Sequence, residues 1–163
     1  MARPSPASES DAEAMVSALL TASRLLVAVS ARSLAAVEDS LTLPQFRMLV
    51  VLDGRGPLSL SGLAGELGVQ PSTAMRMIDR LVAAGMVARG VTAEDRRTSV
   101  ISLTKDGRRI VNEATGRRRR EIAGIVDVMP PGQRRHLIEA LQAFTEAGGE
   151  PPVDNGPRTH ATW

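Results

Sequence analysis

Residues 87–107 limit the fold of this chain more than any other stretch, because they have the pattern of a β-hairpin with a charged tip. Two short apolar runs, residues 87–91 and 100–103, favour strands. The turn between them is acidic and then basic, and it reads Glu94, Asp95, Arg96 and Arg97. Directly upstream, residues 58–86 read as a short helix, a turn at Gly68 and a second helix with a polar outer stripe. This order predicts a winged helix-turn-helix, mainly α-helical with a small β-hairpin wing, whose chemistry is the binding of duplex DNA.

The positive charge of the chain is concentrated around this predicted unit. Residues 1–75 carry 5 Arg and 7 acidic side chains, residues 76–120 carry 12 basic and 5 acidic ones, and residues 121–163 carry 3 Arg and 6 acidic ones. The three segments therefore have net charges of −2, +7 and −3, although the whole chain has only +2. Neutralising DNA phosphates needs such a local excess, so the distribution supports DNA binding more than the total charge does.

Apolar periodicity and capping signals predict six helices. Capping boxes are expected at Ser10 with Glu13 and at Thr42 with Gln45, and each opens a helix. Leu58 to Leu60 can supply a short third strand, after which Ser61 caps the next helix; Thr104 caps the helix that follows the hairpin. The expected helices span about residues 10–37, 42–53, 62–67, 71–85, 105–129 and 132–147.

The chain resembles the MarR family of transcriptional regulators over about residues 10–147. The resemblance rests on LTLPQF at residues 41–46, on the helix-turn-helix pattern of residues 58–89, and on EDRRTSVISLTKDG at residues 94–107, which is similar to the family's wing signature. Gly62 and Gly65 depart from the pattern, because strong helix formers are usual there, and Gln70 replaces the usual Ser-type cap before the second helix of the motif.

The resemblance implies a domain map and a function. Residues 10–40 and 105–147 would form a helical dimerisation region of a homodimer, and residues 41–104 the DNA-binding region; residues 1–9 and 148–163 have the composition of disordered ends. The function implied is that of a regulator, a repressor in our interpretation, which binds an inverted-repeat operator and is released by a small non-covalent ligand.

The wing and the second helix of the motif supply most of the predicted DNA contacts. Arg96 and Arg97 are expected in the minor groove, Asp95 is expected to orient one of them, and Thr98 completes the wing set. Ser72, Thr73 and Arg76 are expected at base edges, Arg80 at a phosphate, and Gln70 at the start of the same helix; Ser59 and Ser61 are expected to hold a phosphate near a helix N-terminus. The alternative for each is an ordinary solvated side chain.

Four consecutive arginines, residues 117–120, span about 300° of a helix and cannot all point to solvent. The resemblance implies an effector cleft between the first, second and fifth helices, which makes Arg47, Met48 and either Arg117 or Arg118 candidate ligand residues for an anionic or aromatic effector. The favoured alternative is that Glu113 and Glu121, each four residues from Arg117, hold it in surface ion pairs.

No enzyme, metal site or cofactor is expected. The chain has no cysteine and only two histidines, and no Gly-rich phosphate loop or nucleophile with a partner base is visible. No leader pattern and no apolar run approaching the roughly 20 residues of a bilayer span was found, so a cytoplasmic protein without membrane contact is expected. Two other functions stay open: a winged-helix module for protein–protein assembly, and a DNA-binding regulator without ligand control.

Overall fold

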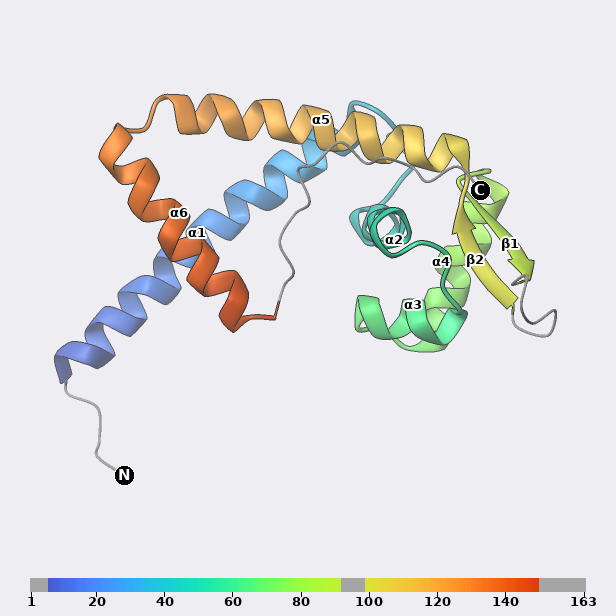
Figure 1. Ribbon diagram of the computed structural model, residues 1–163, viewed down its shortest axis with the longest axis horizontal. Coiled ribbons are helices and arrows are strands. Elements are labelled where there is room, and N and C mark those ends of the chain that lie inside the picture. Colours follow the sequence, from blue (N-terminus) through green and yellow to red (C-terminus); the bar gives the residue numbers. More distant parts are fainter. Residues whose placement is uncertain (1–5, 92–98, 150–163) are drawn as a thin grey trace. The chain divides into compact units, whose positions relative to one another are not determined.

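The computed structural model describes residues 6–91 and 99–149, which form helices and one β-hairpin (Figure 1). The elements, in chain order, are α1 (Pro6–Ala35), α2 (Leu43–Arg55), α3 (Leu60–Leu67), α4 (Pro71–Ala83), β1 (Val87–Val91), β2 (Ser99–Leu103), α5 (Lys105–Asp127) and α6 (Pro131–Ala147). The two strands are antiparallel, and Val87 pairs with Leu103. The predicted fold class, mainly α with a hairpin wing, is confirmed.

The start of the first helix differs from the prediction, whereas the start of the second agrees with it. Since α1 begins at Pro6, Ser10 and Glu13 lie inside the helix and the capping box predicted there is wrong. Proline suits the first turn of a helix, where its missing N–H is not needed. The capping box at Thr42 is confirmed. The backbone N–H of Thr42 donates to Gln45 Oε1 at 2.9 Å, and the backbone N–H of Gln45 donates to Thr42 Oγ1 at 3.4 Å.

Helix α3 is capped by Ser59 and not, as predicted, by Ser61. The Ser59 hydroxyl accepts a hydrogen bond from Gly62 N–H at 3.1 Å, and Ser61 already lies inside the helix. The third strand predicted at Leu58 to Leu60 reduces to a single bridge. Leu58 exchanges two backbone hydrogen bonds with Ile101 of β2, of 3.0 and 2.8 Å, and the helix begins directly afterwards.

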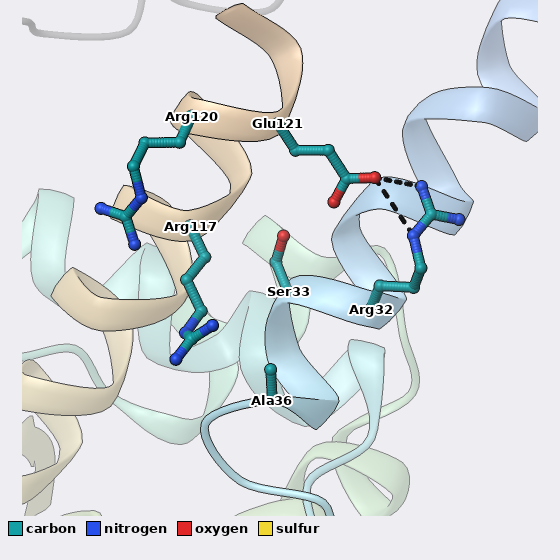
Figure 2. Close-up of a pocket in the computed structure, with 6 residues that line it drawn as sticks. All are labelled: Arg32, Ser33, Ala36, Arg117, Arg120 and Glu121. Carbon is teal, nitrogen blue, oxygen red and sulfur yellow. Dashed lines mark hydrogen bonds and ion pairs between the residues drawn. The ribbon is translucent and has the colours of Figure 1, made fainter. Parts of the chain in front are cut away.

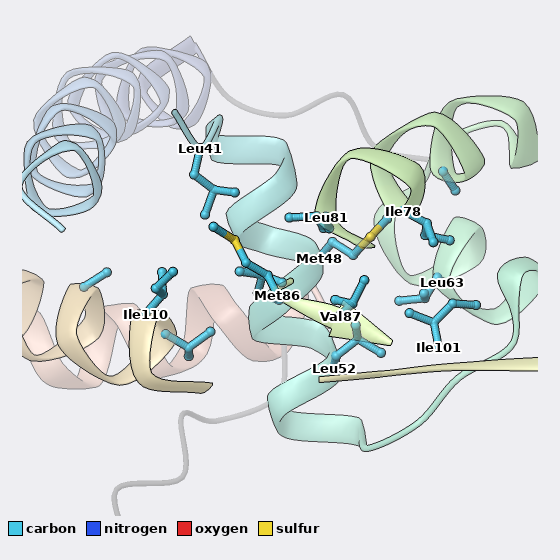
Figure 3. Close-up of a cluster of buried hydrophobic side chains, with 14 of the residues drawn as sticks. Leu41, Met48, Leu52, Leu63, Ile78, Leu81, Met86, Val87, Ile101 and Ile110 are labelled. Carbon is cyan, nitrogen blue, oxygen red and sulfur yellow. The ribbon is translucent and has the colours of Figure 1, made fainter. Parts of the chain in front are cut away.

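The hydrophobic core lies between α2, α3, α4, the hairpin and the first half of α5 (Figure 3). Its largest fully buried side chains are Met48, Leu49, Leu52, Leu63, Ile78 and Leu81. Fully burying such a side chain contributes about 1.5–3 kcal/mol. The shared core therefore holds the helix-turn-helix, the hairpin and α5 in one packed unit.

The base of the hairpin is joined tightly to the start of α5. Thr104 Oγ1 caps α5 by accepting from Gly107 N–H at 3.0 Å, and the same hydroxyl lies 2.8 Å from the Gly85 carbonyl and 3.0 Å from the Met86 carbonyl. Gly107 packs against this backbone so closely that a Cβ there would lie 2.1 Å from the Met86 carbonyl oxygen. Only glycine fits at this position, so the Gly of the KDG sequence fixes the approach of α5 to the hairpin.

An ion pair joins α2 to α5 beside this junction. Arg108 Nη1 lies 2.7 Å from Asp53 Oδ1, and the Asp53 side chain is only 3% exposed. Because a carboxylate buried to this degree needs a charged partner or several donors, the pair fixes the register between the two helices.

The chain divides after Ile122 into two compact units, and the second contains the end of α5 and the helix α6. No side-chain bond caps the N-terminus of α6, which begins after Pro130. Instead Arg134 satisfies carbonyls at the end of α5: its Nε donates to Met129 O at 2.9 Å and its Nη2 to Asp127 O at 2.8 Å. One arginine of α6 therefore fixes the turn between the two helices of this unit.

Helix α1 exposes most of its apolar surface. Residues Ser10–Ala35 are long and apolar enough, by length and composition, to cross a membrane, and only 6% of the apolar 18-residue window within them is buried. The expectation that no apolar run approaches the length of a bilayer span is therefore wrong. Most of the apolar side chains of α1 are therefore left uncovered by the chain's own residues.

Candidate nucleic-acid interface

A left-handed glycine sets the angle between the two helices of the motif. Gly68 ends α3 with φ 65° and ψ 33°, a conformation that glycine adopts without a steric penalty. Gln70 then precedes α4, where its carbonyl accepts from the Thr73 and Ala74 N–H groups at 2.9 and 3.1 Å, but its side chain makes no cap bond. The Gln70 side chain is thus exposed and unused by the fold at the start of α4.

Helix α4 has one buried face and one polar face, as the sequence predicted. Ala74, Ile78 and Leu81 are buried in the core. The predicted contact residues lie on the rest of the helix: Ser72, Arg76 and Arg80 are exposed, and Thr73 is partly exposed. Arg76 Nη2 lies 3.4 Å from Thr73 Oγ1, a weak contact that leaves most of the guanidinium donors available.

The two serines predicted to hold a phosphate lie together at the start of α3. Their hydroxyl oxygens are 3.1 Å apart. Ser59 is partly buried and its oxygen is engaged by the cap bond, so its hydroxyl proton remains to be donated, whereas Ser61 is exposed. The pair has the donors that a phosphate oxygen would use at a helix N-terminus.

The sequence interpretation missed an ion pair between α4 and the wing. Arg89 of β1 pairs with Asp79 of α4, and its Nη2 also lies 3.4 Å from the sulfur of Met75. The pair neutralises the one acidic side chain among residues 71–83 and ties the polar side of α4 to the hairpin. The only sequence signal was the arginine directly after the apolar start of the strand.

The tip of the wing lies outside the described residues. Asp95, Arg96, Arg97 and Thr98 therefore remain predictions, although β1 and β2 bracket them as expected.

The predicted ligand residues are distributed differently from the expectation. Met48 is completely buried in the core, which corrects its assignment to a ligand cleft, and Arg47 is exposed on α2. The structure has instead an open pocket of about 380 Å³ between α1 and α5 (Figure 2). Its lining residues are Arg32, Ser33, Ala36, Arg117, Arg120 and Glu121. Arg117 thus lines this pocket, and Arg118 is not among its lining residues.

The ion pairs predicted for Arg117 are also corrected. Glu121 pairs with Arg32 of α1, and Glu113 pairs with Arg109 at 3.3 Å. Both glutamates that were expected to hold Arg117 have other partners.

Comparisons with known proteins agree with this geometry. The MarR family model matches residues 41–99. The crystal structure of RV1404 from Mycobacterium tuberculosis is 50% identical to this chain, covers 93% of it and 99% of its own chain, and superposes with a TM-score of 0.81. The chain belongs to the MarR family.

Other relatives of this MarR-family chain are more distant. YfiV of Bacillus subtilis, described as an uncharacterized HTH-type transcriptional regulator, is 26% identical over 107 residues, which are 66% of this chain and 67% of YfiV. BpsR of Bordetella bronchiseptica, whose DNA binding is regulated by 6-hydroxynicotinic acid, is 26% identical, with coverage of 78% of this chain and 89% of BpsR and a TM-score of 0.57. The family and these relatives are transcriptional regulators and not enzymes, so the chain is a DNA-binding winged-helix transcriptional regulator.

Proposed function

We propose that this regulator is a cytoplasmic homodimer that represses transcription by occupying an inverted-repeat operator and is released by a small ligand bound without a covalent bond. The observation that carries the DNA-binding mode is the polar outer face of α4, which the core leaves exposed directly after the Gly68 turn. A helix presented in this way fits the major groove of B-DNA.

Each part of this surface has a distinct proposed role. Arg76 contacts a guanine edge, and Ser72 and Thr73 contact neighbouring bases, because they occupy the first two turns of α4. Contacts to phosphates come from Arg80, Ser59 and Ser61. Gln70 contributes at the start of α4, and the wing residues Asp95, Arg96, Arg97 and Thr98 extend the contact to the minor groove.

The exposed apolar residues of α1 and α6 support the homodimer. In α1, Met15, Val16, Leu20 and Val27 are each at least half exposed, and in α6 Ile138 is 56% and Phe144 is 53% exposed. An apolar surface of this extent on two helices is typical of an interface between subunits. We therefore keep residues 10–40 and 105–147 as the dimerisation region and residues 41–104 as the DNA-binding region.

Ligand control is supported by one relative and by the composition of the chain. BpsR, to which the chain is similar over most of its length, responds to a small carboxylic acid. Because the chain has no cysteine, a thiol switch is excluded, and a ligand has to act by binding one arrangement of the two winged units better than another.

Fluorescence anisotropy with the DNA that flanks the regulator's own gene, after footprinting has located the operator, tests the DNA-binding mode. Arg76→Ala should weaken operator binding by about tenfold or more, since a bidentate base contact contributes about 1–3 kcal/mol. Arg118→Ala is the matched control, because it removes the same charge from α5 outside the motif. Affinity should also fall steeply with salt, in proportion to the number of phosphates neutralised.

The same titrations separate the other two functions. A protein-assembly module would show weak, salt-insensitive DNA binding that Arg76→Ala and Arg118→Ala change equally. A regulator without ligand control would bind the operator as proposed, and no small-molecule screen against the preformed complex would release the DNA.

A further inference from the structure

We propose that the pocket between α1 and α5 is a binding site for a doubly charged oxoanion, the phosphate group of a small ligand, held by Arg117, Arg120 and Ser33 (Figure 2). This inference rests on the ligand-controlled part of the proposed function, because it names the chemistry of the ligand. Its test needs no DNA, so a failure of the anion site can be distinguished from a failure of the proposed function.

The first observation is the buried hydroxyl of Ser33. The residue is 4% exposed and its Oγ has no hydrogen-bond partner in the described part of the chain. Other hydroxyls of α1 bond back to the helix: Thr21 to Ser17 O at 3.0 Å, and Ser30 to Leu26 O at 2.8 Å. Ser33 instead points from α1 toward α5. A buried polar group without a partner is costly, so a ligand that accepts this hydrogen bond would remove a penalty of the free protein.

The second observation is the state of the two arginines. Within residues 6–91 and 99–149, neither Arg117 nor Arg120 forms an ion pair or a hydrogen bond. They are one helical turn apart, and Arg120 folds back along α5 so that its Nη1 lies 3.7 Å from the position of a Cβ on Gly116. Two like charges at this spacing repel each other. An anion between them relieves this repulsion.

The charge of the lining decides the class of anion. Arg32, Arg117 and Arg120 supply three positive charges and Glu121 one negative charge, which is already paired with Arg32, so the pocket has a surplus of two positive charges. A phosphate monoester carries about −1.5 to −2 at pH 7 and offers three acceptor oxygens. A monocarboxylate would neutralise half of the surplus. The lining has no aromatic side chain on which a ring could stack.

The test is isothermal titration of the full-length protein with inorganic phosphate at constant ionic strength, with chloride as the balancing anion. Sulfate, succinate and acetate are titrated in parallel. We expect saturable binding of phosphate and sulfate, weaker binding of succinate and none of acetate. Equal heats for all four anions, or no saturable binding of phosphate, would overturn the proposal.

Three variants locate the site. Arg117→Ala and Ser33→Ala should each weaken phosphate binding by about tenfold or more, as expected for one hydrogen bond to a charged group. Arg118→Ala removes the same charge from the neighbouring residue, which does not line the pocket, and should leave phosphate binding unchanged. If Arg118→Ala weakens binding as much as Arg117→Ala does, the anion is attracted by the general charge of α5 and the site assignment is wrong.

Ser33→Ala also keeps the test independent of folding. Replacing an unpartnered buried hydroxyl with a methyl group should leave the melting temperature without phosphate unchanged or raise it. The expected signature is therefore a stable protein that has lost phosphate binding. A Ser33→Ala protein that is stable and binds phosphate like the wild type would remove the hydroxyl from the site and contradict the proposal.

Discussion

The substitution Gly107→Ala offers a quantitative test of the junction between the hairpin and α5. A Cβ at this position would lie 2.1 Å from the Met86 carbonyl oxygen and 2.8 Å from Leu103 Cδ1, whereas real Cβ contacts essentially never fall below 3.0 Å. The carbonyl has to move by about 0.9 Å, the difference between 2.1 and 3.0 Å. It cannot move freely, because Thr104 N–H and Oγ1 both bond to it, at 3.1 and 3.0 Å.

Two contributions lower the stability of Gly107→Ala, and a third raises it. Overpacking against a rigid partner costs typically about 1–3 kcal/mol, and loosening one of the Thr104 hydrogen bonds adds about 0.5–1.5 kcal/mol. The higher helix propensity of Ala returns about 1 kcal/mol. We expect a net loss of about 1–3 kcal/mol in the free energy of unfolding, which lowers the melting temperature by about 3–10 °C for a chain of this size.

The matched control is Gly65→Ala in α3. Gly65 is exposed, and a Cβ there would meet nothing within 4 Å, so the propensity gain of up to about 1 kcal/mol should appear undiminished. Both variants are compared with the wild type by thermal and urea unfolding at one protein concentration, since association affects apparent stability. If Gly107→Ala is as stable as the wild type, or shifts in the same direction as Gly65→Ala, the close packing at Gly107 is refuted.

The remaining predictions concern assembly, recognition, protonation and redox sensitivity. Leu20→Arg, at a side chain that is 62% exposed, should convert the proposed homodimer to monomers in analytical ultracentrifugation. A dimer that is unchanged by Leu20→Arg would place the interface elsewhere. Arg97→Ala should weaken binding to all DNA sequences alike, whereas Arg76→Ala should also relax the preference at one base pair per half-site. Equal small effects of the two variants in anisotropy titrations would argue against the minor-groove assignment of Arg97 and the major-groove assignment of Arg76. Hydrogen bonds from the Ser40 side chain and backbone lower the pKa of Glu38 below its ordinary value of 4.5. The stability that these bonds contribute to the fold is therefore present above pH 4.5 and is lost as the pH falls through the pKa of the folded state. Ser40→Ala should raise the pKa of Glu38 in an NMR titration. Peroxide and chelators should leave operator binding unchanged at doses that spare methionine, and reversible release by either would contradict non-covalent control.

Amphipathic periodicity allowed the winged-helix motif to be predicted from the sequence, and capping signals placed helix ends less well. The buried face of α4 was correct because Ala74, Ile78 and Leu81 repeat at the helical period against one core. The cap of α3 was misplaced because Ser59 and Ser61 are both good N-cap residues. The choice between them depends on the backbone bridge between Leu58 and Ile101, which keeps the chain extended up to Ser59.

Charged partners were the least predictable part of the candidate sites. Spacing along a helix suggested that Glu121 would pair with Arg117, but such a pair contributes only about 0.2–0.5 kcal/mol. An arginine from another helix can therefore replace Arg117 easily as the partner of Glu121. Arg32 of α1, which lies 89 positions before Glu121, forms that pair instead. The pair between Asp53 and Arg108 likewise joins separate helices, and no local pattern marks it.

The exposed apolar helix α1 is best explained by a second copy of the chain, although its length and composition also fit a membrane span. Val29 and Leu34 are buried against the chain's own residues, so one end of α1 already belongs to a folded protein surface. Arg24 lies near the middle of Ser10–Ala35, where a bilayer would place it in hydrocarbon at a cost of about 2.5–3.5 kcal/mol or more. Between two protein subunits the same guanidinium can reach solvent or a carboxylate, while its neighbours Leu20 and Val27 are covered. The proposed dimer would therefore bury the apolar residues of α1 without burying its charge.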